Sequence, residues 1–153
     1  MTALNAPQPL AVESNLSGLA RMARFVYLIS TVLFIGAIVL QVFFAGAALL
    51  VSTDYLHQHR SFAHVVELIT FSVAIVALFA RLPRRLLALS WLPVGLFILQ
   101  YVFLHAIPAM QLPMALRALH AVNALVFFWN ALYLMRAAWG LVRTPQGGNA
   151  NGL

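Results

Sequence analysis

Residues 25–51 read FVYLISTVLFIGAIVLQVFFAGAALLV and contain no charged side chain. An α-helix needs about 20 apolar residues to cross the hydrocarbon core of a bilayer. This stretch is long enough to do so, and it is too long for the apolar core of a cleaved signal peptide. We therefore expect it to be a transmembrane helix and an uncleaved anchor.

Three further apolar runs follow the first and predict three more spans, over residues 62–80, 86–107 and 114–135. The turn at residues 81–85 (RLPRR) is short, and its proline ends the preceding helix. Short connections favour an up-down-up-down bundle, in which the first and third spans are diagonal partners, as are the second and fourth. The predicted fold class is all-α, a four-transmembrane-helix up-down-up-down bundle.

The ends of the chain differ in composition from the apolar runs. Residues 1–20 are rich in Asn, Pro, Ala and Ser, and residues 144–153 (TPQGGNANGL) are equally polar. Such segments bury too little apolar surface to fold alone. We expect a disordered cytoplasmic segment at 1–20, one transmembrane domain at 21–143 and a flexible cytoplasmic tail at 144–153.

The overall composition points to lipid as the main solvent. The chain is 63% hydrophobic and 8% charged, whereas soluble domains carry about 25% charged residues. It has no cysteine, which excludes disulfides, thiolate metal sites and iron–sulfur clusters. It also lacks a Gly-rich phosphate loop and a nucleophile–base arrangement, which argues against kinases and hydrolases.

The nine basic residues are all arginine, and they give a formal net charge of +6. They are scattered at the edges of the apolar runs without interleaved aromatic residues, so they do not indicate nucleic-acid binding. Cytoplasmic loops are enriched in Lys and Arg. The predicted localisation is therefore the inner (plasma) membrane, multi-pass, with both termini inside. The seven arginines assigned to the cytoplasmic side are Arg21, Arg24, Arg81, Arg84, Arg85, Arg136 and Arg143, with Arg60 and Arg117 on the outer side.

All five histidines fall on the predicted outer side. Polar side chains in a membrane are costly unless partnered, so they mark functional sites. His57 and His59 precede the second span, where we expect an aqueous loop. His105 ends the third span, where it is either functional or bonded to headgroups. Glu67 lies three residues after His64 on the same helix face and is a partner for an imidazole or a buried, protonated carboxyl.

His64 and His120 lie at similar depth on the two diagonal helices, which is what a six-coordinate haem b requires. We predict these two as the metal ligands, although an interhelical hydrogen bond to Asn123 or Gln41 is the structural alternative. Arg60 and Arg117, at the rim of the same helices, are expected to pair with the haem propionates. The remaining residues of the candidate cofactor site are His59, His105 and Asn123, with aromatic walls from Phe62, Phe71, Phe127, Phe128 and Trp129.

Two segments carry a resemblance to known families. His59-Arg60-x-x-Ala63-His64 and Leu119-His120-x-x-Asn123-Ala124 resemble the ligand segments of small four-helix b-type membrane cytochromes, and are similar to one half of the haem A synthase family. That resemblance implies haem ligation by the histidine of the His-Arg pair, which is His59 here, and by His120. The acidic residue of that family, three positions before the first histidine, is replaced by Leu56, and haem A synthase activity does not carry over.

The segment Gln41-x-x-x-Ala45-Gly46 is similar to a family of uncharacterised small bacterial four-helix membrane proteins, which implies no activity. Three functions follow from the residues as hypotheses. The first is a haem b protein transferring electrons between a quinol and an outer acceptor, or within a larger membrane complex or homodimer. The second is a non-haem metal protein using His64, Glu67, His105 and His120, and the third is a cofactor-free scaffold subunit.

Overall fold

The computed structural model describes residues 18–143, so most of the predicted terminal segments lie outside the described residues. Residues 18–20, assigned from sequence to the N-terminal segment, form the first turn of α1. The elements are α1 (Gly18–Leu50), α2 (Tyr55–Phe79), α3 (Arg84–Tyr101), the π-helix η1 (Val102–Ala106), α4 (Ile107–Ala109), the 3₁₀-helix η2 (Met114–Ala118) and α5 (Leu119–Arg143).

Within the described residues, four helical segments are long and apolar enough to cross a membrane: Gly18–Leu50, Tyr55–Phe79, Arg84–Ala109 and Met114–Arg143. Large apolar side chains also cover the outside of the bundle, as they do where lipid is the solvent. The chain is therefore a multi-pass membrane protein, and the predicted all-α four-helix bundle is confirmed.

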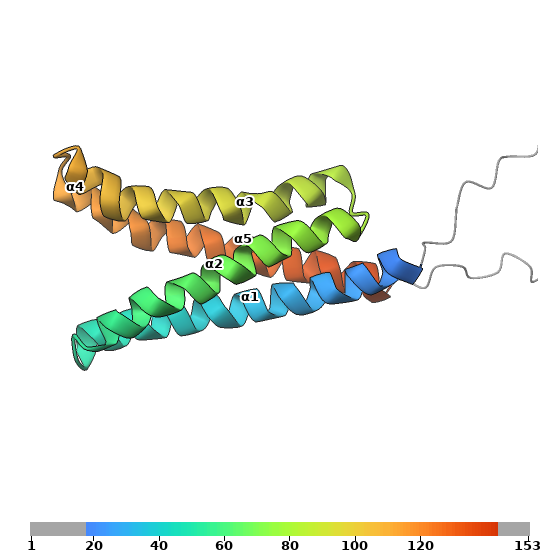
Figure 1. Cartoon of the computed structure of the whole chain (residues 1–153), viewed down its shortest axis with the longest axis horizontal. Coiled ribbons are helices and arrows are strands. Elements are labelled where there is room, and N and C mark those ends of the chain that lie inside the picture. The colour runs from blue at the N-terminus through green and yellow to red at the C-terminus, as the bar shows by residue number, and fades with distance from the viewer. Residues whose placement is uncertain (1–17, 144–153) are drawn as a thin grey trace, which may run out of the picture.

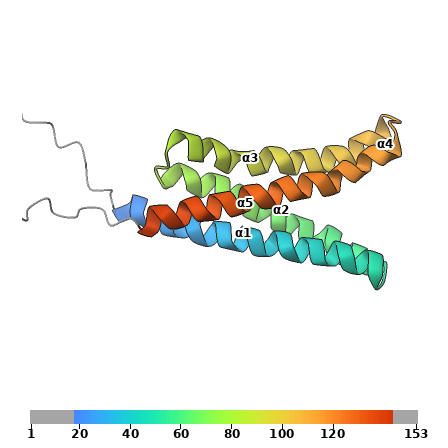
Figure 2. The same ribbon diagram turned by 180° about the vertical axis from the view of Figure 1, so that it is seen from behind.

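The four long helices form a ring in the order α1, α2, α3, α5. α1 packs against α2 and α5, and α3 packs against the same two helices (Figures 1 and 2). α1 and α3 are therefore diagonal partners, and so are α2 and α5, as the short connections predict.

Each long helix buries a stripe of residues spaced seven apart along the sequence. A seven-residue repeat keeps one narrow face of a helix toward its neighbours in a left-handed bundle. The buried stripes are Ala20, Tyr27 and Phe34 on α1; Val66 and Val73 on α2, with Ala80 directly after its last residue; Leu86 and Pro93 on α3; and Phe127 and Leu134 on α5.

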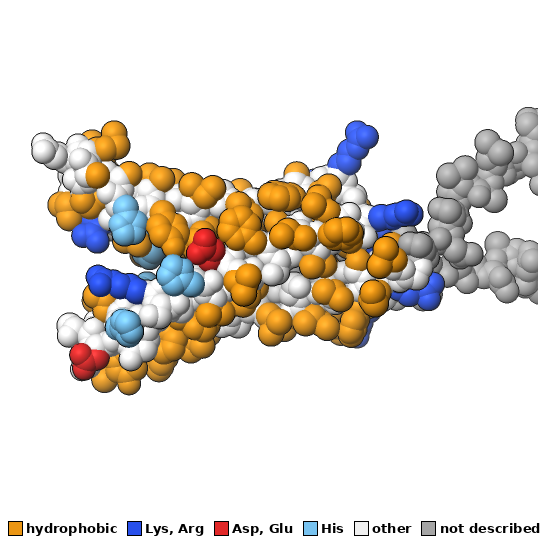
Figure 3. All heavy atoms as spheres, viewed as in Figure 1, with side chains coloured by type: hydrophobic (Ala, Val, Ile, Leu, Met, Phe, Trp, Pro, Cys, Tyr) orange, Lys and Arg blue, Asp and Glu red, His pale blue; other side chains and the backbone are white. Residues whose placement is uncertain are grey.

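The two ends of the bundle are packed differently. The Arg-rich end is where α1 begins, α2 meets α3 and α5 ends; the His end is where α1 meets α2 and α3 meets α5. Buried residues start only at Val66 on α2 and at Asn123 on α5, so the core lies toward the Arg-rich end. At the His end the α1–α2 and α3–α5 hairpins diverge (Figure 1), and the surface is notched between them (Figure 3).

One side-chain hydrogen bond crosses the bundle along the α1–α3 diagonal. The Tyr27 hydroxyl and the Ser90 hydroxyl are 2.7 Å apart, and both side chains are fully buried. A buried hydroxyl needs a partner in an apolar interior, and each residue supplies one to the other.

α2 begins earlier than the sequence predicts. The turn before it is closed by bonds from Tyr55 N to Ser52 O (3.1 Å) and from His57 N to Asp54 O (3.1 Å), which lead directly into the helix. The Ser52 hydroxyl also accepts a bond from Asp54 N at 3.2 Å, the local pattern that favours Ser at helix starts. His57 and His59 are consequently helical, and the expectation that they lie in a loop is wrong.

The third span is helical through Ala109, but it is irregular at two places. Pro93 lies inside α3 and removes the N–H that would bond the Leu89 carbonyl. The Asn130 side chain of α5 donates to that carbonyl, with Nδ2 3.4 Å from the oxygen. Further along, η1 widens the helix into a π-turn, a feature that often accompanies functional sites.

Candidate functional site

Four polar side chains form a layer near the His end, one from each long helix. Each of these residues lies seven positions before or after a buried residue of its own helix, and so continues that helix's buried stripe. Each side chain is half-buried. The period that packs the core therefore also turns these side chains inward. This polar layer consists of Gln41 (seven after Phe34), His59 (seven before Val66), Gln100 (seven after Pro93) and His120 (seven before Phe127).

His59 is fixed to α1 by two hydrogen bonds with Gln41. The His59 Nδ1 atom is 3.0 Å from the Gln41 backbone oxygen. The side-chain nitrogen of Gln41, Nε2, donates to the His59 backbone oxygen at 2.9 Å. A carbonyl oxygen only accepts, so Nδ1 carries the proton and Nε2 of the neutral ring carries the lone pair. This arrangement, with a backbone carbonyl orienting the ring, is typical of metal-binding histidines. The same side-chain nitrogen of Gln41 lies 3.4 Å from Nε2 of His59, at the outer limit of a hydrogen bond.

His120 faces His59 across the α2–α5 diagonal. The two ring centroids are 6.4 Å apart, and the ring planes make an angle of 74°. Within the part of the chain that is described, the buried atoms Gln41 Oε1 and Gln100 Oε1 have no hydrogen-bond partner, and His120 Nδ1 has none of ordinary geometry, although its ring lies near the Gln100 backbone. Buried polar atoms are normally paired, so this layer has unused capacity for a ligand or for water.

An aromatic floor lies below the polar layer, toward the Arg-rich end. The Phe127 ring centroid is 5.0 Å from that of Phe34 and 6.5 Å from that of Phe97. Of the aromatic walls expected from sequence, Phe127 is buried here, whereas Phe71 is 40% and Trp129 76% exposed on the outer surface. The site is thus closed on its inner side by large apolar rings.

Arg60 and Arg117 lie at the rim of the layer and are exposed. Arg117 lies three residues before His120. The described residues provide neither arginine with an ion pair. Figure 3 shows arginine and histidine side chains on both sides of the notch. The rim therefore offers two cations that are free to pair with anionic groups.

His64 lies outside this layer. Its side chain is 74% exposed on the outer surface of α2, and its Nδ1 is 3.4 Å from a carboxylate oxygen of Glu67. His64 lies five residues after His59, which turns it away from the stripe that His59 extends. The structure therefore pairs His120 with His59, the histidine that the resemblance indicates, and not with His64.

The other two predicted site residues have structural partners. Asn123 is buried, and its Nδ2 donates to the Leu96 backbone oxygen at 2.8 Å, which joins α5 to α3. His105, in η1, is exposed and stacks on Tyr101 with 5.7 Å between ring centroids and an interplanar angle of 24°. Neither side chain takes part in the hydrogen bonds of the polar layer.

The four-ligand metal site considered from sequence is not assembled. No group of three or more His, Cys, Asp or Glu side chains within residues 18–143 is placed to hold a metal ion. His64 and Glu67 meet each other, but His120 belongs to the polar layer and His105 to the stack with Tyr101.

Comparison with known proteins finds a similarity to one protein-family model. A family of unknown function (DUF6220) matches residues 41–107, which is less than half of the chain. No curated protein and no solved structure matches. The matched range begins at Gln41 and includes His59 and Gln100, so three of the four residues of the polar layer lie in the part of the chain that is similar to this family.

Proposed function

We propose that the polar layer binds one haem b, with His59 and His120 as the two axial ligands, and that the protein transfers electrons in the membrane. The observation that carries the proposal is the His59–His120 separation. Two metal–nitrogen bonds of about 2 Å on opposite sides of one ion place imidazole centres roughly 6 Å apart. The His59 and His120 ring centroids are 6.4 Å apart.

The donor chemistry of the layer fits this group. The lone pair of His59 lies on Nε2, because Nδ1 is bonded to a carbonyl, and the buried Nδ1 of His120 makes no hydrogen bond of ordinary geometry. Imidazole is a suitable ligand for iron. Arg60 on α2, and Arg117 in η2 directly before α5, would hold the propionates at the notched end.

A bound haem supplies one-electron chemistry. The residues of the chain set where that chemistry takes place: the floor of Phe34, Phe97 and Phe127 separates the layer from the Arg-rich end. The position of the polar layer fits a quinol as electron donor and an acceptor at the His end. It also fits a protein that works within a larger membrane complex. The excess of arginine at the opposite end supports an inner-membrane location with that end in the cytoplasm.

The test is the absorption spectrum of the detergent-purified protein, oxidised and reduced, after expression with an adequate haem supply. We expect a Soret band that His59→Ala and His120→Ala each abolish. His64→Ala is the matched control, because it removes an imidazole from the same helix at an exposed position. That variant should keep the full band.

Colourless wild-type protein, or a band lost in His64→Ala and kept in His59→Ala, would overturn the proposal. Stoichiometric metal without porphyrin would favour a two-histidine metal site instead. A protein that stays folded and colourless in every variant would favour the cofactor-free scaffold.

A further inference from the structure

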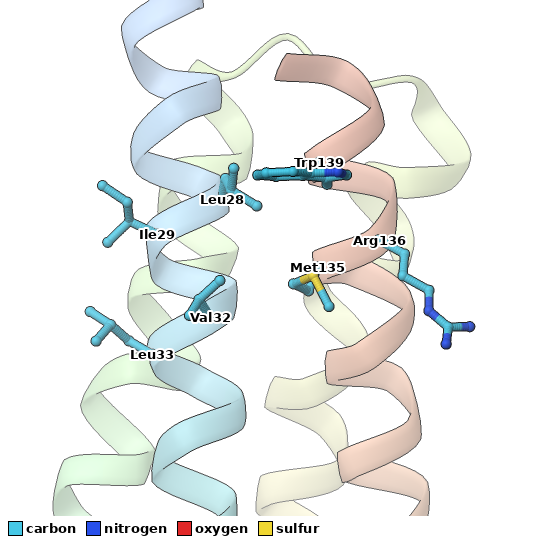
Figure 4. A pocket seen from close by; sticks show the side chains of 7 residues that line it. All are labelled: Leu28, Ile29, Val32, Leu33, Met135, Arg136 and Trp139. Carbon is cyan, nitrogen blue, oxygen red and sulfur yellow. The ribbon is translucent and has the colours of Figure 1, made fainter. Parts of the chain in front are cut away.

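An apolar groove runs between α1 and α5 near the Arg-rich end, on the opposite side of the aromatic floor from the polar layer. It has a volume of about 630 Å³ and opens to the outside of the bundle. Figure 4 shows Leu28 and Val32 of α1 facing Met135 and Trp139 of α5, with the Trp139 ring across the end of the groove. The groove is lined by Leu28, Ile29, Val32, Leu33, Met135, Arg136 and Trp139.

Positive charge surrounds the end of this groove that Trp139 covers. The Arg143 guanidinium lies 4.3 Å from the centroid of the Trp139 ring. Arg21 lies seven residues before Leu28, two turns along the same face of α1. Arg136 lies on the groove wall; its side chain extends away from α1 in Figure 4, and no hydrogen bond or ion pair within residues 18–143 holds it there.

Within residues 18–143, no acidic side chain lies at this end of the molecule to compensate this charge. Asp54 and Glu67 are the two acidic residues within the described range; Asp54 lies in the loop before α2, and Glu67 lies at the midpoint of α2. Arg136 also lies seven residues before Arg143, which places it about 10 Å further into the membrane along the helix axis. An arginine near the end of a span extends its guanidinium toward the headgroups, where an anionic partner is available.

We propose that this groove binds an anionic phospholipid from the leaflet at the Arg-rich end. The acyl chains lie against the apolar lining, and the headgroup phosphate pairs with Arg143 beside the Trp139 ring. Arg136 supplies a second cation when its side chain turns back toward the groove. Basic pockets between transmembrane helices are the kind of site that binds anionic headgroups. A second copy of the chain in the same orientation fits less well, because residues 18–143 of that copy would bring no carboxylate to this end.

Trp139 can report on the occupant of the groove directly. The chain has three tryptophans, so the Trp91→Phe, Trp129→Phe variant keeps Trp139 alone. This protein is reconstituted into phosphatidylcholine vesicles that contain a small fraction of phosphatidylglycerol or of phosphatidylcholine, each with or without brominated acyl chains. For each lipid, the Trp139 emission with brominated acyl chains is divided by the emission with unbrominated chains, and the two ratios give the relative affinity for the headgroups. Quenching by groups within the protein is the same in both measurements, so it cancels in the ratio.

We expect brominated phosphatidylglycerol to quench Trp139 more strongly than the same fraction of brominated phosphatidylcholine. Arg136→Gln with Arg143→Gln should lower this preference by up to about 25-fold, since each basic residue near a headgroup contributes about fivefold. Arg84→Gln with Arg85→Gln removes the same charge at the same end, but on α3, and should preserve the preference. Val32→Phe, which fills the groove and keeps every charge, should lower the quenching by both brominated lipids.

Equal quenching by the two lipids would overturn the proposal, and so would an equal loss in the α3 control. Quenching that disappears as the protein-to-lipid ratio rises would assign the groove to a second copy and would also overturn it. These outcomes are independent of haem binding, because the readout depends on the headgroup and not on the cofactor.

Discussion

Pro93 leaves a gap in the hydrogen bonding of α3, and a single side chain of α5 fills it. Proline has no N–H, so the Leu89 carbonyl four residues earlier is bonded by Asn130 Nδ2 instead. We expect Asn130→Ala to lower the free energy of unfolding by about 1 kcal/mol, the usual size of a side-chain hydrogen bond in a membrane interior. Reversible unfolding in mixed micelles measures this loss.

The matched experiment repeats this substitution in a Pro93→Ala background. Removing the proline restores a backbone N–H that can bond the Leu89 carbonyl, so Asn130→Ala should be less destabilising in that background. The same loss in both backgrounds would show that Asn130 acts through packing and not through the carbonyl freed by proline.

Tyr27 and Ser90 form a pair whose two partners are not equivalent. The Ser90 hydroxyl also donates to the Leu86 carbonyl at 2.8 Å, so it keeps a partner when the tyrosine hydroxyl is removed. Ser90→Ala instead leaves a buried tyrosine hydroxyl without its partner. An orphaned buried polar group costs about 1–3 kcal/mol, so Ser90→Ala should destabilise the bundle more than Tyr27→Phe in the same unfolding assay. The opposite order would contradict this expectation.

The candidate ligands illustrate how far sequence reasoning reaches at the scale of residues. The sequence indicates a histidine on α2 opposite His120, but depth alone favours His64, whereas the resemblance indicates His59. The direction of a side chain depends on the helical stripe to which it belongs. His59 continues the buried series Val66, Val73 and Ala80, and that series can be identified only once the core is known.

The turn between α2 and α3 depends on a side chain from a third helix. Arg24 of α1 donates from Nε to the Ala80 carbonyl at 3.1 Å and from Nη2 to the Arg81 carbonyl at 3.4 Å. These carbonyls follow the end of α2, where backbone oxygens lack helical partners. Arg81 has a φ of 47°, a conformation that is unfavourable for a residue with a side chain. Arg24 therefore stabilises both the helix end and the turn.

We expect Arg24→Gln to lower the free energy of unfolding by about 1–3 kcal/mol, because it removes charge-assisted bonds to two carbonyls. Arg21→Gln is the control at the same end of α1: it removes the same charge from an exposed side chain that has no hydrogen bond within the described residues. Mixed-micelle unfolding of both variants tests the expectation. Equal losses would mean that net charge at this end, and not the two bonds, stabilises the bundle.

The helices themselves are largely predictable, and their irregularities are not. Long apolar runs determine that a segment crosses the membrane, so all four spans can be identified from sequence. The predicted start of α2 is too late, because the polar residues 52–59 suggest a loop while their backbone bonds form a helical start. The π-helix at 102–106 could not be predicted, because the apolar sequence VFLHA carries no signal for it.

At the scale of the whole molecule, charge and burial divide the bundle into two functional ends. The core and seven of the nine arginines lie toward the Arg-rich end, and all the histidines lie toward the His end. This division follows from sequence because it depends only on where residues occur along four spans. The divergence of the two hairpins depends on side-chain packing that the sequence pattern does not specify.

The orientation of these ends can be tested with neutral substitutions, since the chain has no cysteine. Leu19 is 63% exposed at the Arg-rich end, and Met110 is 68% exposed at the His end. If the arginine excess sets the topology, a membrane-impermeant maleimide should label Met110→Cys in intact cells and label Leu19→Cys only after lysis. Neither substitution changes the number of arginines, so the topology signal stays intact. The reverse labelling would place the polar layer next to the cytoplasm, and an electron acceptor would then have to approach the notch from that side.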